Sequence, residues 1–256
     1  MKLISIDLKA DFGFFRKPDT NNTINLSYNL IHKPAILGIL GAILGLEGYQ
    51  NKGELPQYYQ LLKHLQIGIR PLNNEKGNFL KTNIKYSNTV GYANKGSNLL
   101  TEELTLIAPC YRIFILLDET KELEQKLYDY LKEAKAEFIP YFGKNEFTAS
   151  WLKSSFQDYT FEKASKEQME SFNILSVFKK DDRLKDKSGT PEIDLLNYAS
   201  REEPFLYFER LPEDFDSELM QYKLGEFAFT NYAVQNSFKL DGLYQLNESK
   251  DYVQLN

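Results

Sequence analysis

The sequence contains little of what enzymes usually use for catalysis or metal binding. Among its 256 residues there are one cysteine, Cys110, and two histidines, His32 and His64. A single cysteine excludes a disulfide framework and a cysteine-based zinc site. Neither a G-x-S-x-G nucleophile elbow nor a G-x-x-x-x-G-K-S/T phosphate loop occurs. We therefore predict no catalytic residue, no metal site and no cofactor.

Long hydrophobic runs are also missing. Residues 1–7 carry charges where a secretory signal peptide needs an apolar run. The longest apolar stretch, residues 34–46, has about thirteen residues, whereas a helix that crosses a bilayer needs about 20. We expect a cytoplasmic protein that has no membrane partner.

The net charge of −5 conceals a difference between two parts of the chain. Residues 1–150 hold 18 Lys/Arg and 16 Asp/Glu, whereas residues 151–256 hold 13 and 20. Residues 52–100 alone carry seven basic side chains against two acidic ones. This distribution favours a basic nucleic-acid surface in the first part and an acidic, protein-facing second part.

An almost wholly apolar helix is predicted at residues 34–46, with Pro34 at its first position. Gly38, Gly41 and Gly45 fall on one stripe of this helix, although a glycine in a helix interior costs roughly 1 kcal/mol relative to alanine. Something must therefore approach the helix backbone closely. Tight packing on a sheet is one interpretation, favoured by the spacing alone; a backbone surface offered to a ligand is the other.

Hydrophobic periodicity predicts a strand, helix, strand, strand, helix and strand at residues 2–12, 34–46, 65–70, 111–117, 123–134 and 147–151. This βαββαβ order is that of the α+β, ferredoxin-like fold, which RNA-recognition modules also use, and it stacks both helices on one face of the sheet. Residues 71–101 are rich in Asn, Gly and Lys and are predicted to form an inserted, solvent-facing β-hairpin. We place a ferredoxin-like domain at 1–155 and a smaller β-rich region at 156–256, with strands at 173–178, 205–208 and 224–229.

Three motifs carry a resemblance to a known family. They are Phe-Phe-Arg-Lys-Pro at 14–18, the glycine-striped helix, and Tyr-Phe-Gly-Lys-Asn-Glu-Phe at 141–147. Together and in this order they resemble the CRISPR-associated Cas-five family of the RAMP superfamily. The helix and the second turn are most similar to its type I-B branch, and the insert lies where that family has its thumb hairpin.

The resemblance implies a non-catalytic subunit of a type I Cascade surveillance complex, which acts in antiviral defence. Such a subunit grips the 5′ handle of the CRISPR RNA and caps the filament of Cas-seven-type backbone subunits. It also docks the Cas-eight-type large subunit, so that it meets target DNA only through the complex.

The residues themselves suggest how RNA would be held. The backbone of the helix glycines and of the turn at 142–145 would face phosphates, and basic side chains would supply charge. Tyr86 or Tyr92 would provide a stacking face. The predicted RNA-binding residues are Arg16, Lys17, Gly38, Gly41, Lys81, Lys85, Tyr86, Gly143, Lys144 and Asn145. For 142–145 a plain helix-to-strand turn is the other interpretation.

Two other functions stay open. In the type I-C branch the family resembles a metal-independent endoribonuclease that cuts the repeat RNA with a tyrosine, a lysine and a histidine. Here the one Lys-His dipeptide, Lys63-His64, lies before the second strand and not in the later RNA-facing region. A generic RNA-recognition module is the second alternative, but the strand at 110–116 lacks the usual glycine-aromatic signature.

Overall fold

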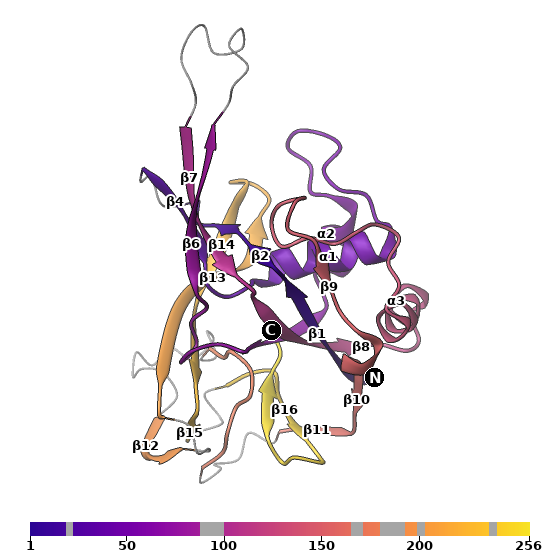
Figure 1. Ribbon diagram of the computed structural model, residues 1–256. Coiled ribbons are helices and arrows are strands. Elements are labelled where there is room, and N and C mark those ends of the chain that lie inside the picture. Colours follow the sequence, from indigo (N-terminus) through magenta and orange to yellow (C-terminus); the bar gives the residue numbers. More distant parts are fainter. Residues whose placement is uncertain (19–22, 88–99, 165–170, 180–192, 199–202, 236–239) are drawn as a thin grey trace, which may run out of the picture.

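The computed structural model describes residues 1–18, 23–87, 100–164, 171–179, 193–198, 203–235 and 240–256, with the backbone alone at 193–198. The described chain is mostly β-strand, with the helices α1 (Lys33–Leu44), α2 (Gln57–Leu62) and α3 (Glu122–Glu133) (Figure 1). This confirms the expected α+β class. Within these residues no helix has both the length and the apolar character that spanning a membrane requires.

The central sheet is antiparallel, with the strand order β10–β1–β8–β5. Its strands are β1 (Lys2–Ala10), β5 (Gln66–Leu72), β8 (Cys110–Leu117) and β10 (Gln157–Tyr159), and the short β9 (Ala149–Ser150) pairs with the far end of β1. In the chain, α1 and α2 lie between β1 and β5, and α3 lies between β8 and β9. Helices at these two crossovers and this strand order are those of a ferredoxin-like sheet.

Both long helices cover one face of this sheet, as the sequence predicts. Along β1, Ile4, Ile6 and Leu8 belong to the large core that includes the helix side chains, whereas Leu3 belongs to a different cluster. Successive side chains of a strand point to opposite faces. The alternation seen in the sequence therefore predicts which face of the sheet each side chain of β1 occupies.

The opposite face of the central sheet is covered by β16 (Leu243–Leu246) and β17 (Tyr252–Gln254). Leu3, Phe114 and Leu116 pack there with apolar residues of and next to these strands. The approach is close, because a β-carbon at Gly68 of β5 would lie 2.9 Å from the main-chain oxygen of Gln254. This part of the sheet face is therefore closed to a ligand.

A second sheet carries the predicted insert. β6 (Lys81–Ser87) and β7 (Leu100–Ile107) form an antiparallel hairpin that projects from the body of the molecule (Figure 1). Its tip, with Tyr92, lies outside the described residues. β7 runs past the predicted end at 101 and also pairs with β2 (Phe12–Gly13) and, in parallel, with β4 (Ile24–Tyr28). β3 (Phe15–Arg16) completes the sheet beside β4. The base of the hairpin is thus joined to the Phe-Phe-Arg-Lys-Pro motif at 14–18.

The C-terminal region is β-rich, as predicted, but not every strand lies where it was expected. β13 (Leu206–Asp216) and β14 (Gln221–Thr230) form a long hairpin that packs on α1. The predicted strand at 173–178 is wrong, because this segment makes only isolated bridges. β11 (Phe161–Lys163) joins β16, and β12 (Ile193–Tyr198) pairs with β15 (Tyr232–Val234).

One hydrophobic core crosses the predicted boundary at 155. Val177, Leu211 and Phe227 belong to the same cluster as Ile4 of β1 and Ile36 of α1. The packing is thus continuous from the central sheet into the β13–β14 hairpin, while the division at 155 stays a prediction.

Candidate nucleic-acid interface

A groove of about 1150 Å³ runs along α1, and we call it the α1 groove. Its walls come from β3, α1, the segment between α1 and α2 with α2 itself, the turn at 138–144 and the β13–β14 hairpin. Of the ten residues predicted to bind RNA, it brings together Arg16, Gly38, Gly143 and Lys144. Each of the three sequence motifs contributes to this set.

The turn at 141–147 meets β2 and β3 because its glycine allows a very close contact. Gly143 has φ +84°, and a β-carbon there would overlap the carbonyl group of Phe14. The neighbouring Phe142 is fully buried, its ring packs on those of Phe15 and Tyr111, and its carbonyl oxygen accepts the N–H of Phe14 at 3.0 Å. Two of the motifs are therefore held directly against each other.

Lys144 forms an ion pair within the groove. Its ammonium lies 2.5 Å from the carboxylate of the buried Glu103 on β7 and 4.1 Å from the centroid of the Tyr86 ring on β6. Burial disfavours the charged form, but the hydrogen bond and the charge attraction to Glu103, together with the contact to Tyr86, outweigh it, and the pKa of Lys144 is raised. Lys144 thus ties the turn to both strands of the hairpin, and a phosphate would have to compete with Glu103 for it.

Arg16 is the predicted cation best placed to meet a phosphate. It is exposed on β3 at the edge of the groove, and no residue in the described part of the chain forms an ion pair with it. Asn145 is exposed in the adjoining turn. On β6, next to Tyr86, Lys85 is 72% exposed and pairs with Glu102 at 2.9 Å.

Lys17 and Lys81 lie outside the groove, around a buried carboxylate. Glu209 of β13 accepts the N–H groups of Asn29 and Leu30 at 3.1 and 3.0 Å and pairs with the Lys17 ammonium at 2.9 Å. The Lys81 ammonium donates to the side-chain oxygen of Asn29 at 3.1 Å, and burial lowers the pKa of Lys81. Both lysines hold β3, β4, β6 and β13 together, and their RNA contacts stay predictions.

The glycine stripe of α1 is filled by a tyrosine. The Tyr58 side chain of α2 lies along the helix, with its hydroxyl oxygen 3.7 Å from the place of a Gly38 β-carbon. A β-carbon on Gly41 would overlap the start of the Tyr58 side chain, and Gly45, at φ +78°, is the left-handed C-cap of α1. Close packing thus explains the stripe, but the packing partner is α2 and not a sheet. Gly41 is closed to RNA by Tyr58.

The two interior glycines should respond differently to alanine. Gly41→Ala is expected to lower the free energy of unfolding by about 1–3 kcal/mol, because the new methyl group displaces Tyr58. Gly38→Ala meets only ordinary van der Waals distances and should gain up to about 1 kcal/mol from its better helix propensity. Urea unfolding of both variants measures the difference. Equal effects would contradict this packing.

Sequence reasoning missed the aromatic lining of the α1 groove. Five tyrosines line it. The hydroxyl of one of them, Tyr59, donates to Asp214, and we call the other four, Tyr49, Tyr58, Tyr141 and Tyr222, the tyrosine cluster. Tyr49 is 60% exposed and Tyr141 is 42% exposed. The four come from the segment after α1, from α2, from the turn at 138–144 and from β14, so no local pattern connects them. The only signal in the sequence was its wealth of tyrosine, 17 residues.

His32 is a structural group at the start of α1. Its Nδ1 accepts the N–H of Ala35 at 3.3 Å and so caps the helix. Its ring packs edge-on against those of Tyr28 and Phe15. Burial lowers the pKa of His32 to about 3, so the ring is neutral at pH 7.

Acid should weaken the fold through this histidine. An unfolded histidine has a pKa of about 6.5, so below that pH the unfolded chain takes up a proton that His32 in the folded protein resists until about pH 3. Stability present above pH 6.5 is therefore lost as the pH falls, by about 2 kcal/mol between pH 7.5 and 5. His32→Asn keeps a capping acceptor and should remove this loss in urea unfolding at the two pH values. A variant that keeps the wild-type pH dependence would contradict the assignment.

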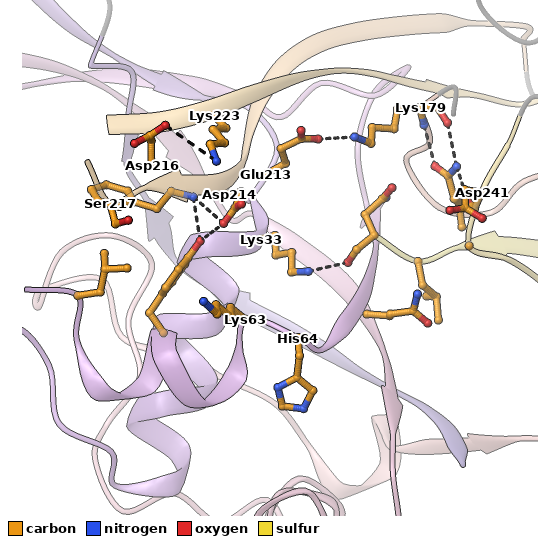
Figure 2. A pocket seen from close by; sticks show the side chains of 18 of the residues that line it. Lys33, Lys63, His64, Lys179, Glu213, Asp214, Asp216, Ser217, Lys223 and Asp241 are labelled. Atoms are coloured by element: carbon orange, nitrogen blue, oxygen red, sulfur yellow. Dashed lines mark hydrogen bonds and ion pairs between the residues drawn. The ribbon is translucent and has the colours of Figure 1, made fainter. Parts of the chain in front are cut away.

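A second cleft, of about 950 Å³, holds the residue types that the endoribonuclease alternative needs (Figure 2). Tyr59, Lys63 and His64 all line it. The Tyr59 hydroxyl donates to Asp214, and burial raises the pKa of Tyr59. His64 Nε2 lies 2.7 Å from the carboxylate of the buried Glu124. The tyrosine and the histidine are therefore each engaged with a carboxylate of the protein.

Two further lysines of the second cleft form ion pairs. The Lys179 ammonium lies 2.5 Å from Glu213, and Lys223 lies 3.9 Å from Asp216, as Figure 2 shows. Throughout the described part of the chain, no three His, Cys, Asp or Glu side chains gather as metal ligands would. The cleft thus carries both positive and negative side chains, and these pairs neutralise each other.

Comparison with solved structures identifies the fold. The chain is similar to a chain of a CRISPR RNA-guided surveillance complex, with a TM-score of 0.50 at 10% identity over 91% of both chains. It is also similar to a chain of the type III-B Cmr-beta bound to cognate target RNA and AMPPnP, with a TM-score of 0.51 at 13% identity over 99% of both. A CRISPR protein from Archaeoglobus fulgidus gives a TM-score of 0.48 at 15% identity, over 98% of this chain and 97% of that one.

No protein-family model matches the sequence, and neither does any curated protein. The first two structures nevertheless define the class of architecture: the chain shares its fold with a chain of a CRISPR RNA-guided surveillance complex and with a chain of a type III-B Cmr-beta assembly. At these identities the likeness is one of fold.

Proposed function

We propose that the protein is a non-catalytic subunit of a CRISPR surveillance complex and that it binds the 5′ handle of the CRISPR RNA in the α1 groove. The observation that carries this proposal is that three separate sequence motifs meet in one groove, on a fold shared with a chain of such a complex. Arg16 offers a cation to a phosphate. The hairpin beside it, with Lys85 and Tyr86, extends the surface along which a single strand can lie.

The motifs support a type I complex of the I-B branch. In that role the subunit caps the filament of Cas-seven-type backbone subunits and docks the Cas-eight-type large subunit, and it meets target DNA through the complex. The second part of the chain suits protein neighbours, because it is acidic and bears exposed apolar side chains such as Phe208, which is 56% exposed.

Two observations favour this proposal over its alternatives. The tyrosine of such a cleavage site must have its hydroxyl free to act on the RNA, but the Tyr59 hydroxyl donates to Asp214. A generic RNA-recognition module reads RNA on its open sheet face. In this protein the corresponding face is covered by β16 and β17.

Arg16→Ala is expected to weaken binding of the repeat-derived 5′ handle. Lys17 and Lys144 are paired with Glu209 and Glu103, so their removal would also disturb the fold, and Arg16 alone is the clean probe. The loss of one phosphate contact should flatten the slope of log affinity against log salt concentration by about 0.7. Fluorescence anisotropy with labelled handle RNA at several salt concentrations measures this slope. Arg210→Ala, which removes an exposed arginine outside the groove, should leave it unchanged.

The same RNA also tests the subunit proposal. The isolated chain should bind the handle weakly, and co-expression with the backbone subunits and a guide RNA should give a stoichiometric complex. Repeated purification of that complex without this chain would refute the proposal.

Incubation of end-labelled repeat RNA with the pure protein, with or without Mg²⁺, should give no discrete product. A product that disappears in the His64→Ala variant would establish the endoribonuclease instead.

A further inference from the structure

We propose that the tyrosine cluster forms a pocket for one unstacked nucleobase of the bound RNA strand. This inference rests on the proposed function and adds to it a site that reads base identity. Its starting point is that the four tyrosines of the cluster come from four separate segments and line one groove. The glycines of α1 leave the room that the Tyr58 side chain occupies there.

The four side chains of the cluster line the same groove, and their hydroxyl groups are available. Burial raises the pKa of Tyr58, and the phenols of Tyr49, Tyr222 and Tyr141 raise it further. None of the four hydroxyls hydrogen-bonds to another described residue, whereas the Tyr59, Tyr111, Tyr128 and Tyr130 hydroxyls do. Polar groups that converge in an apolar cleft without internal partners are what a ligand site requires.

The chemistry of the cluster suits a base better than a phosphate. A phenol is both a hydrogen-bond donor and an acceptor, as is the edge of a nucleobase, and its ring offers a stacking face. Burial raises the pKa of Tyr58 and of Tyr222, so these groups are neutral at pH 7. The cations of the groove, Arg16 and Lys144, lie on β3 and on the turn at 138–144, which also carries Tyr141. A strand can therefore place a phosphate at Arg16 and turn a base toward the tyrosines.

The packing supplies a rigid floor for such a base. Tyr58 is fixed on Gly38 and Gly41 of α1. Tyr222 packs on the rings of Phe215 and His32, with centroid distances of 5.4 and 5.7 Å. Tyr49 and Tyr141 are the more exposed members, 60% and 42%, and can close on the base from the rim. A floor held by packing costs little conformational entropy on binding.

The test is a coupling measurement on the full chain. Fluorescein-labelled, eight-nucleotide RNAs from the 5′ handle, each with one abasic site, are titrated by anisotropy at low salt. In the wild type, one position should lose about 5- to 100-fold in affinity, the usual size for one stacked base. In Tyr141→Ala and in Tyr49→Ala the intact RNA should bind more weakly, and the abasic site at that position should cost nothing further. Phe208→Ala, which removes an exposed ring outside the groove, should behave as the wild type.

A second measurement separates stacking from base reading. Replacing Tyr49, Tyr141 and Tyr222 together by phenylalanine keeps the rings and removes three hydroxyls. This variant should bind within a few-fold of the wild type but no longer distinguish the four bases at the coupled position. Wild-type binding in which no position is coupled to Tyr141 or Tyr49 would overturn the pocket and leave the proposed function standing. A wild type that fails to bind any handle RNA would overturn both.

Discussion

Gly143→Ala is expected to lower the free energy of unfolding by about 4 kcal/mol or more, the largest effect of any single methyl group considered for this protein. Gly143 has φ +84°, which strains any L side chain, and its β-carbon would overlap the carbonyl of Phe14. The added β-carbon is bonded directly to the backbone of the turn, and the carbonyl belongs to the backbone of Phe14. Neither can therefore move without separating the turn from β2 and β3. The α1 groove would open at the same place.

A matched glycine isolates the contribution of this contact. Gly53 has φ +87°, but a β-carbon there would have no described neighbour within 4 Å. Gly53→Ala should therefore show only the cost of the backbone conformation, about 1–3 kcal/mol. Urea unfolding of both variants gives the difference, which measures the contact between the turn and Phe14. If the two variants lost the same stability, that contact would not stabilise the fold.

Glu209→Leu is expected to lower the free energy of unfolding by about 3 kcal/mol. Its carboxylate accepts the N–H groups of Asn29 and Leu30 just before α1 and is buried, with a side-chain exposure of 5%. Removing it leaves two buried donors without an acceptor, and each such donor costs about 1–3 kcal/mol. The loss should appear as a lower urea midpoint with an unchanged slope.

The partner of Glu209 provides the comparison. Lys17→Met leaves both backbone hydrogen bonds to Glu209 in place, so it should destabilise less than Glu209→Leu. Combining the two substitutions should not restore stability, because the N–H groups of Asn29 and Leu30 still lack an acceptor. Recovery in the double variant would show that the ion pair, and not the backbone hydrogen bonds, is the stabilising contact.

The parts of the fold that the sequence predicts are those with a strong and regular apolar pattern. Along β1, Ile4, Ile6 and Leu8 alternate with polar residues, and β8 is apolar without a break from Ile113 to Leu117. In α3, Leu127 and Leu131 recur at helical spacing and are buried. These patterns define the order of strands and helices in the central sheet. They also predict α1 to within two residues at its C-terminal end.

The parts that it does not predict depend on partners far away in the chain. β7 buries Glu103 and Thr105, so its pattern looks like that of an exposed loop. Glu103 can be buried because Lys144, from a turn 41 positions later, neutralises it. For the same reason Lys17 looked like a free cation although its partner is Glu209. The tyrosine cluster is a property of the tertiary fold and could not be read from local spacing.

The strands that cover the central sheet also determine when the chain can finish folding. Leu3, from the first strand, is buried in the same cluster as Val253, and Ile67 exchanges both main-chain hydrogen bonds with Asn256 at 3.0 and 3.1 Å. Contacts between such distant segments slow folding. During synthesis the apolar side chains of this face stay bare until the strands at 243–254 have left the ribosome, and a nascent chain in that state is prone to aggregation. The yield of folded protein should therefore depend on how well this one surface is protected before the chain is complete.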